Sequence, residues 1–258
     1  MKKFLRQHIW TIICALVVLQ FCFPKYIKRM IYPYLFGTKT DVVLTVSSQD
    51  YFEDTPPKTF VFSRGKYQYH LVTKTVYAIT GRVGIVDDYS TLFNRIFRGQ
   101  FQGRYINLVP QDVFLVIGDM ARDDVFQKLK FEHEERLGRV VCKGVKYRRS
   151  FMGAFLSSED AERNMQKLND CMRDVKQHEQ NNYHPIPANE RINKALSMLL
   201  PGDIVYLEGW LVDVPDMGLK TGTRKEQYHE NIIIGGSSPG MCFILYTTKL
   251  ILNGRLYM

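Results

Sequence analysis

The sequence contains none of the short motifs that identify many metal proteins and nucleotide-binding enzymes. Its five cysteines form no C-x-x-C pair, its six histidines form no H-E-x-x-H motif, and no glycine-rich loop could cradle phosphate groups. These absences argue against a zinc ribbon, a zinc protease of that type and a phosphate-binding loop. We therefore expect no metal and no cofactor, and the sequence favours a protein without a catalytic centre.

Cysteine is also too scarce for a disulfide-stabilised scaffold. Cys14 and Cys22 lie in an apolar N-terminal run, which leaves Cys142, Cys171 and Cys242 in the rest of the chain. Three cysteines allow at most one intramolecular disulfide, which argues against a disulfide framework. The cysteines alone leave the compartment open.

Acidic residues are absent from the first 39 positions, although these contain seven lysines and arginines. The formal net charge of +9 is therefore concentrated at the N-terminus, because the other 28 basic residues stand against 26 acidic ones, a balance of about +2. This distribution is typical of charges that flank a membrane segment, and it argues against a broad phosphate-binding face.

Residues 9–23, IWTIICALVVLQFCF, carry no charge. As a helix they would be roughly 22 Å long, somewhat shorter than a hydrocarbon core of about 30 Å, and flanking basic side chains could reach the headgroups. Tyr26, Tyr32 and Tyr34 follow at positions typical of a membrane interface. We predict an uncleaved transmembrane helix in contact with the lipid bilayer; a cleaved signal peptide and a buried helix of a soluble protein are the alternatives.

The chain divides into an anchor and one domain. Residues 1–37 are predicted to be the membrane anchor with its juxtamembrane segment, and residues 38–65 a tether that leads into the first strand. Residues 66–258 are predicted to form a single β-rich domain with an inserted helix at about 158–180.

Glycines lie inside several of the predicted strands. Gly81, Gly144 and Gly209 each interrupt a run of β-branched and aromatic residues, where a glycine usually marks a bulge or a sharp bend. We therefore predict an α+β fold: a β-rich, strongly curved sheet or small barrel with two helices, preceded by the transmembrane helix. An open sheet with three unrelated glycines is the alternative.

The inserted helix carries a narrow apolar stripe with charge on both sides. The stripe includes Met165, Leu168 and Met172. It indicates either a surface helix packed on its own domain or a helix that pairs with a partner. The second predicted helix, ANERINKALSMLL, ends at a Pro-Gly turn that leads into a long strand.

Two groups of polar residues are candidate binding sites. His184 follows Asn182 closely in NNYHPIPAN, where a structural hydrogen-bonding role is favoured over catalysis or metal binding. Arginines and aromatics alternate in FNRIFRGQFQGRYIN, and its arginines are suited to stacking on unpaired bases, to lipid headgroups or to a protein contact: Arg95, Arg98 and Arg104.

The order of five motifs resembles a family of uncharacterised bacterial membrane-anchored or exported proteins. The motifs are YAITGRV, LVPQDVFLVIGDM, NYHPIPANERINKAL, PGDIVYLEGWLVDV and GMCFILY, against a family pattern of ITARV, LSPxDLALGWGxMSD, SANMHLIPA, GDxVxLxGYLV, SSLTRxDTG and GACE. Arg224 and Cys242 match that pattern, whereas Ile117 replaces its tryptophan and Phe243 its last acid. The resemblance implies a compact anchored domain outside the cytoplasm and assigns no reaction.

These observations favour a non-catalytic binding or scaffold component of a bacterial envelope assembly. We expect a single-pass protein of the inner membrane with its C-terminal domain in the periplasm, and other membrane or envelope proteins, or a second copy of the chain, as partners. The first alternative is a membrane-tethered hydrolase or ligand-binding enzyme that uses His184, Asn182 and Arg224. A nucleic-acid-binding domain is the second alternative, against which the nearly neutral domain argues.

Overall fold

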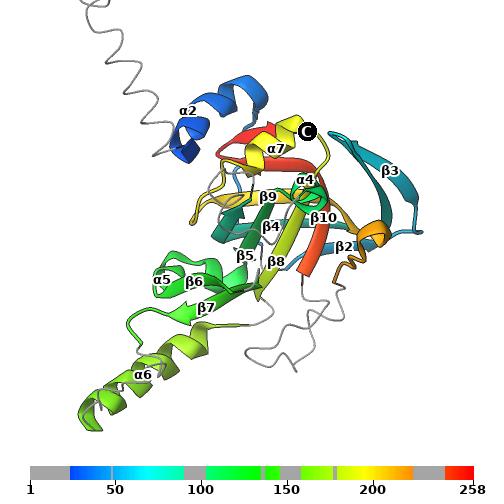
Figure 1. Cartoon of the computed structure of the whole chain (residues 1–258). Helices are drawn as coiled ribbons and strands as arrows, with labels where there is room; N and C mark the ends of the chain where they lie inside the picture. Colours follow the sequence, from blue (N-terminus) through cyan, green and yellow to red (C-terminus); the bar gives the residue numbers. More distant parts are fainter. Residues whose placement is uncertain are drawn as a thin grey trace, which may run out of the picture.

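The computed structural model describes residues 24–47, 49–89, 103–134, 137–145, 158–176, 179–222 and 242–258 (Figure 1). The predicted transmembrane segment 9–23 and the candidate residues Arg95, Arg98 and Arg224 lie outside these ranges. Among the helices of the described residues, none is both long and apolar enough to cross a bilayer.

Five strands close into a small barrel. They are β4 (Tyr67–Asp88), β5 (Gln111–Val116), β8 (Gln180–Pro187), β9 (Ile204–Asp213) and β10 (Cys242–Leu252). β4 pairs with β5 and β9, β5 pairs with β8, and β10 joins β8 to β9 and so completes the ring. Only the β8–β10 pair among these five is parallel. The predicted β-rich α+β class is confirmed.

Shorter strands extend this sheet or lie beside it. β1 (Thr38–Lys39) pairs with β11 (Arg255–Tyr257), while β2 (Tyr51–Asp54) and β3 (Thr59–Arg64) both pair with the long strand β4. Residues 38–65, predicted as a tether, thus contribute three strands to the sheet. A separate hairpin consists of β6 (Leu129–Glu134) and β7 (Leu137–Cys142).

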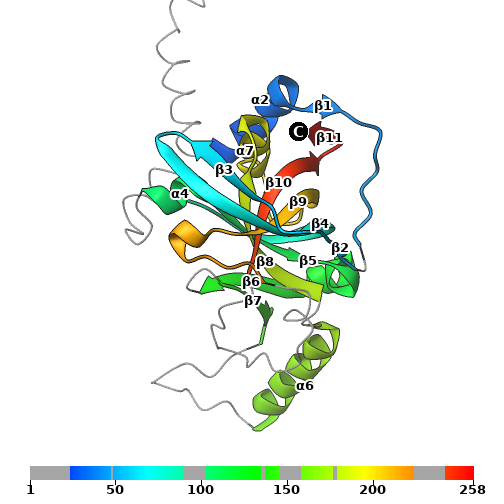
Figure 2. The same cartoon turned by 90° about the vertical axis from the view of Figure 1, so that its right-hand side faces the viewer.

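The described helices lie outside the barrel. They are α2 (Pro24–Phe36), α4 (Arg104–Leu108), α5 (Asp123–Phe126), α6 (Ser158–Asp174) and α7 (Glu190–Leu196), with short 3-10 turns η1 (Gly118–Ala121) and η3 (Pro215–Met217). α2 and α6 lie at opposite ends of the molecule in both views (Figures 1 and 2). The predicted inserted helix ends at Asp174, earlier than expected, because the chain from Gln180 onward is already strand β8.

Two of the glycines that were predicted to lie within strands have different roles. A Cβ atom at Gly209 of β9 would lie 1.9 Å from the carbonyl oxygen of Tyr246 in β10, so only glycine permits this close approach of two barrel strands. Gly144 was predicted to lie within a strand, and this prediction is wrong. β7 ends at Cys142, and Gly144 occupies the following turn with φ +74°, a conformation that suits glycine.

The barrel interior is one apolar core, and two further apolar clusters lie on its outer surface. Val113, Tyr183 and Phe243 belong to the interior core. Ile244 belongs to an outer cluster with Leu108 of α4, and Phe114 to another outer cluster beneath α6 and the β6–β7 hairpin. Closed five-stranded barrels occur in folds with many different ligands, so the architecture alone assigns no function.

Candidate functional site

Three side chains on adjacent strands face outward from the same part of the barrel wall. Successive side chains of a strand alternate between its two faces, and Val113, Tyr183 and Phe243 all point into the interior core. Their neighbours Asp112, His184 and Cys242 therefore lie on the outer face. In the parallel β8–β10 pair, Cys242 is opposite Asn182 and Ile244 is opposite His184.

The prolines of β8 explain where these side chains meet. Pairing between β5 and β8 stops at Val113 and Tyr183, while β8 stays paired with β10 as far as Pro187. Pro185 and Pro187 have no N–H to donate, so this part of β8 does not need a second neighbour. His184 consequently lies at the point where β5 and β8 separate, beside Asp112.

His184 is hydrogen-bonded to Asp112 within the barrel wall and has Cys242 as a neighbour on the adjoining strand. Its Nδ1 lies 2.6 Å from Oδ1 of Asp112, and the Tyr89 hydroxyl donates to Oδ2 of the same carboxylate at 2.7 Å. The Cys242 thiol is a second neighbour that favours the charged imidazole. Because Nδ1 is taken by Asp112, Nε2 is the nitrogen left for the thiol.

Burial and charge determine the protonation of His184. Burial by itself lowers the pKa of the imidazole, but the charge and hydrogen bond of Asp112, together with Cys242, outweigh it and raise the pKa from 6.5 to about 9. His184 is 8% exposed and Asp112 only 1% exposed, so water screens this pair poorly. At neutral pH the imidazole is therefore protonated between a carboxylate and a cysteine.

Cys242 is the free cysteine of the described residues and is partly exposed. The other two form a disulfide, Cys142–Cys171, which joins β7 to α6 with Cα atoms 6.0 Å apart. This agrees with the expectation of at most one disulfide. A partly exposed thiol beside an imidazolium is the arrangement that makes a cysteine nucleophilic.

Asn182 lies next to Cys242 across the β8–β10 pair. Its Oδ1 accepts a hydrogen bond from the backbone N–H of Gly138 in β7, at 2.8 Å, which fixes the orientation of the amide. Within the described part of the chain its Nδ2 group makes no hydrogen bond, and this nitrogen is not fully buried. This amide is thus a hydrogen-bond donor available beside the thiol.

A second histidine–aspartate pair holds the β6–β7 hairpin on the same outer face. His133 Nδ1 lies 2.7 Å from Asp87 Oδ2, and Asp87 is directly opposite Asp112 in the β4–β5 pair. Together with the bond from Gly138 to Asn182, this pair fastens the hairpin beside the His184 site. The site is therefore enclosed by β5, β8, β10 and the hairpin.

The remaining candidate residues do not join this site through any described contact. The Arg104 guanidinium donates to the carbonyl of Gln68 at 2.8 Å and to Asp216 at 3.2 Å, and it lies over the Tyr69 ring. On α6, Leu168 packs against the outer cluster under the hairpin, whereas Met165 and Met172 are exposed. The helix thus packs on its own domain with one part of its stripe and leaves the other part open.

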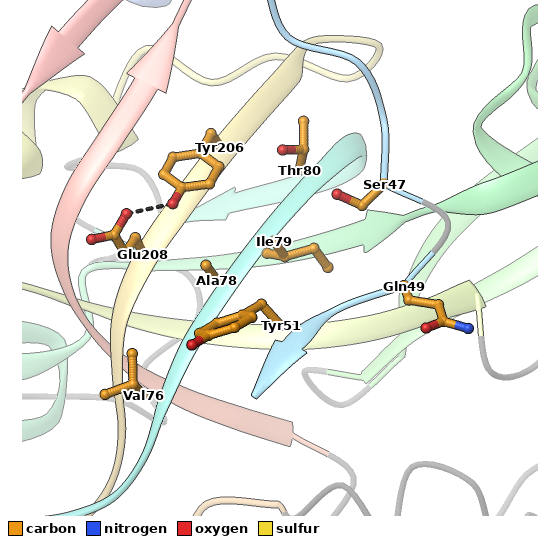
Figure 3. A pocket seen from close by; sticks show the side chains of 9 residues that line it. All are labelled: Ser47, Gln49, Tyr51, Val76, Ala78, Ile79, Thr80, Tyr206 and Glu208. Atoms are coloured by element: carbon orange, nitrogen blue, oxygen red, sulfur yellow. Dashed lines mark hydrogen bonds between the residues drawn. The ribbon is translucent and has the colours of Figure 1, made fainter. Parts of the chain in front are cut away.

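A concave region lies on β4 and β9, away from His184 (Figure 3). It has a volume of about 400 Å³ and is lined by Ser47, Gln49, Tyr51, Val76, Ala78, Ile79, Thr80, Tyr206 and Glu208. The Tyr206 hydroxyl donates to Glu208, and Lys249 lies 3.0 Å from the same carboxylate. Its lining contains no histidine or cysteine, and its carboxylate is already paired.

Comparison with known proteins gives no match: no protein-family model, no curated protein and no solved structure is significantly similar to this chain. The function is therefore argued from the residues and their geometry alone.

Sequence reasoning identified His184 and Asn182 but did not connect them with Asp112, Tyr89 or Cys242. One signal was present. Asp112 directly precedes the apolar run VFLVI, which is typical of a buried strand. A carboxylate buried beside such a strand needs a partner. The partner's identity depends on the strand order, which places residues 112, 184 and 242 side by side.

Proposed function

We propose that this protein is a cysteine-dependent acyl-transfer enzyme of the hydrolase type. The observation that carries the proposal is the buried imidazole of His184, hydrogen-bonded to Asp112 and neighboured by the free cysteine Cys242 on the adjoining strand. Cys242 is the nucleophile, His184 the acid and base, and Asp112 the group that orients and charges the imidazole. Tyr89 holds the carboxylate in place.

The proposed reaction proceeds in two steps. The Cys242 thiolate attacks the carbonyl carbon of an ester, thioester or amide, which forms a C–S bond, and the His184 imidazolium then protonates the leaving alcohol, thiol or amine as its bond to the carbonyl breaks. The neutral imidazole next removes a proton from water. The resulting hydroxide attacks the thioester, releases the carboxylic acid and restores the thiolate and imidazolium.

Asn182 supports the negative oxygen that forms in each step. A hydrogen-bond donor aimed at this oxygen typically contributes a factor of roughly 10²–10³ in rate. The Asn182 amide lies beside Cys242, with its Oδ1 already engaged by Gly138, so its Nδ2 group is oriented as the donor. The sequence predicted a hydrolase site with His184, Asn182 and Arg224. The proposed site keeps His184 and Asn182 and adds Cys242 and Asp112, while Arg224 lies outside the described residues.

We propose an enzyme rather than a scaffold because an enzyme explains the charged pair of Asp112 and His184 in the barrel wall. A buried carboxylate and imidazolium cost desolvation energy, and pairing them with a free thiol adds nothing that a frame for protein docking requires. The scaffold function stays a prediction, for which the exposed Met165 and Met172 are the strongest support.

The disulfide supports a location outside the cytoplasm. Structural disulfides persist in oxidising compartments such as the periplasm, and Cys142–Cys171 joins two elements of the folded domain. We propose a domain in the periplasm, held at the inner membrane of a bacterium by residues 9–23.

Alkylation of Cys242 tests the proposed thiolate–imidazolium pair. The full chain is treated with iodoacetamide at a series of pH values, and modification is followed in the tryptic peptide between Lys225 and Lys249, whose only cysteine is Cys242. We expect the native protein to react at pH 6.5 at least roughly tenfold faster than His184→Gln, in which the thiol has no neighbouring imidazolium.

His70→Gln is the matched control, because His70 pairs with Asp216 on the surface at 2.9 Å and makes no described contact with Cys242. It should react as the native protein does. Equal rates at pH 6.5 for the native chain and His184→Gln would refute the proposed activation of Cys242.

A further inference from the structure

Helix α2 has the reverse of the usual amphipathic pattern. At 100° per residue, one side of the helix presents Tyr26, Met30, Ile31, Tyr34 and Leu35, which we call the α2 ridge. Met30 is 73% exposed and Tyr34 77% exposed. A surface helix of a soluble protein normally turns such residues toward its core.

The charges of α2 lie on the side that faces the protein. Arg29 donates to Asp203 at 2.7 Å, and Lys28 lies 3.9 Å from the buried Asp88. Burial lowers the pKa of Lys25, which shows that this amine is also turned inward. The helix therefore uses its polar residues to hold the barrel and leaves an uncharged ridge on the outside.

A contact between Tyr32 and Lys194 joins α2 to α7 and so helps to fix the direction of the ridge. Tyr32 packs edge-on against Phe36, and the Lys194 amine of α7 lies 5.1 Å from the centre of the Tyr32 ring. Both views show α2 beside α7 at the end of the molecule farthest from α6 (Figures 1 and 2). Tyr32, predicted at the interface, thus faces the protein, while Tyr26 and Tyr34 are exposed.

The position of the ridge in the chain favours lipid as its occupant. Residues 9–23, which carry no charge, end immediately before Pro24, the first residue of α2. The ridge likewise carries no charge that could select an ionic protein partner, and it places two tyrosines among aliphatic side chains, the composition of an interfacial helix.

We propose that the α2 ridge lies in the boundary between headgroups and acyl chains of a bilayer. The barrel is then held against the membrane by its α2 end, with α6 directed away from the surface. This inference concerns α2 alone and does not depend on the chemistry of Cys242.

Quenching of tryptophan fluorescence by brominated lipid tests the proposal. The full chain is reconstituted in phosphatidylcholine vesicles with plain or brominated acyl chains, and Tyr34→Trp is compared with Tyr51→Trp. Both tyrosines are exposed, but Tyr51 belongs to β2. Tryptophan at position 34 should keep the contact of the ring with Arg255, 4.7 Å from its centre.

The signal added by Tyr34→Trp, after subtraction of the native chain, should fall roughly twofold or more in brominated vesicles, while that of Tyr51→Trp should stay unchanged. Equal quenching of the two variants, or none of either, would overturn the proposal. A Tyr34→Trp signal that depends on protein concentration but not on bromination would assign the ridge to a second copy of the chain and would also overturn it.

Discussion

At the scale of single residues, the protonation of His184 is set by one carboxylate. Asp112 bonds to Nδ1, is itself fixed by the Tyr89 hydroxyl, and lies almost completely out of water. The same carboxylate therefore orients the ring toward Cys242 and keeps it charged. The substitution Asp112→Asn removes the charge of this side chain while keeping its shape.

Asp112→Asn should reduce acyl transfer by roughly 10²–10⁴-fold, because the amide can neither hold the imidazolium nor select the correct ring nitrogen. The measurement is the steady-state hydrolysis of p-nitrophenyl acetate. Asp216→Asn, which alters the surface pair with His70, is the control and should leave the rate unchanged. A similar loss in both variants would show that the effect is not specific to the site.

The raised pKa of His184 also predicts a pH-dependent stability. A histidine whose pKa rises from 6.5 to about 9 on folding contributes stability that is fully present below pH 6.5 and is lost as pH rises through about 9. Since one pKa unit corresponds to about 1.4 kcal/mol, the loss over this window is at most about 3 kcal/mol.

Urea unfolding at pH 6.5 and pH 9, followed by Trp210 fluorescence, measures this change. Between pH 6.5 and pH 9 the free energy of unfolding of the native chain should fall more than that of His184→Gln, which has no imidazole at position 184. A parallel pH dependence in the two proteins would contradict the assigned pKa.

At the scale of elements, the β6–β7 hairpin positions Asn182. A Cβ atom at Gly138 would lie 2.1 Å from the Phe114 ring, so this glycine permits the hairpin to approach the barrel closely enough to donate to Asn182. His133 and Asp87 hold the hairpin from its other strand. The hairpin is therefore part of the proposed active site, although it contributes no reacting group.

Gly138→Ala should push the hairpin away from Phe114 and release the Asn182 amide. We expect p-nitrophenyl acetate hydrolysis to fall by roughly tenfold or more, as in the loss of an oxyanion donor, while Cys242 still reacts rapidly with iodoacetamide. Asn182→Ala should reproduce this combination. If Gly138→Ala instead retains full hydrolysis, the hairpin does not position the amide.

Elements with a strong local pattern were predictable from the sequence. The β-branched runs indicated long strands such as β9, and the spacing of apolar residues indicated α6. Gly209 was predicted to mark a bulge or bend, whereas in the structure it permits the close approach of β9 and β10. Gly144 was misassigned because a glycine in a turn next to a strand has the same local pattern as one within it. Asp112 and Cys242 were not connected with His184, because their proximity depends on the order of strands around the barrel, which local pattern does not contain.

At the scale of the whole molecule, the proposals describe a barrel with a membrane-facing end and a catalytic side. The α2 ridge lies at one end of the molecule and α6 at the other. The Cys142–Cys171 disulfide joins α6 to the hairpin. A substrate carried on, or tethered near, the bilayer would meet a site held at a constant distance from it. The proposed periplasmic location would provide the oxidising compartment in which such a disulfide persists.

Fusion of alkaline phosphatase to the C-terminus tests this orientation, because the enzyme is active only where its own disulfides form. We expect an active fusion, with Cys142 and Cys171 protected from alkylation unless the protein is first reduced. An inactive fusion, together with free Cys142 and Cys171 in freshly lysed cells, would place the domain in the cytoplasm.

The acyl-enzyme itself is the most direct test of the central claim. The full chain is mixed with p-nitrophenyl acetate and quenched in acid, and the tryptic peptide between Lys225 and Lys249 is weighed by mass spectrometry. A burst of nitrophenolate with one acetyl group on Cys242, absent in Cys242→Ala and diminished in His184→Gln, is the predicted result. Undiminished hydrolysis by Cys242→Ala, or a native peptide that never acquires the acetyl group, would contradict the assignment of Cys242 as the nucleophile.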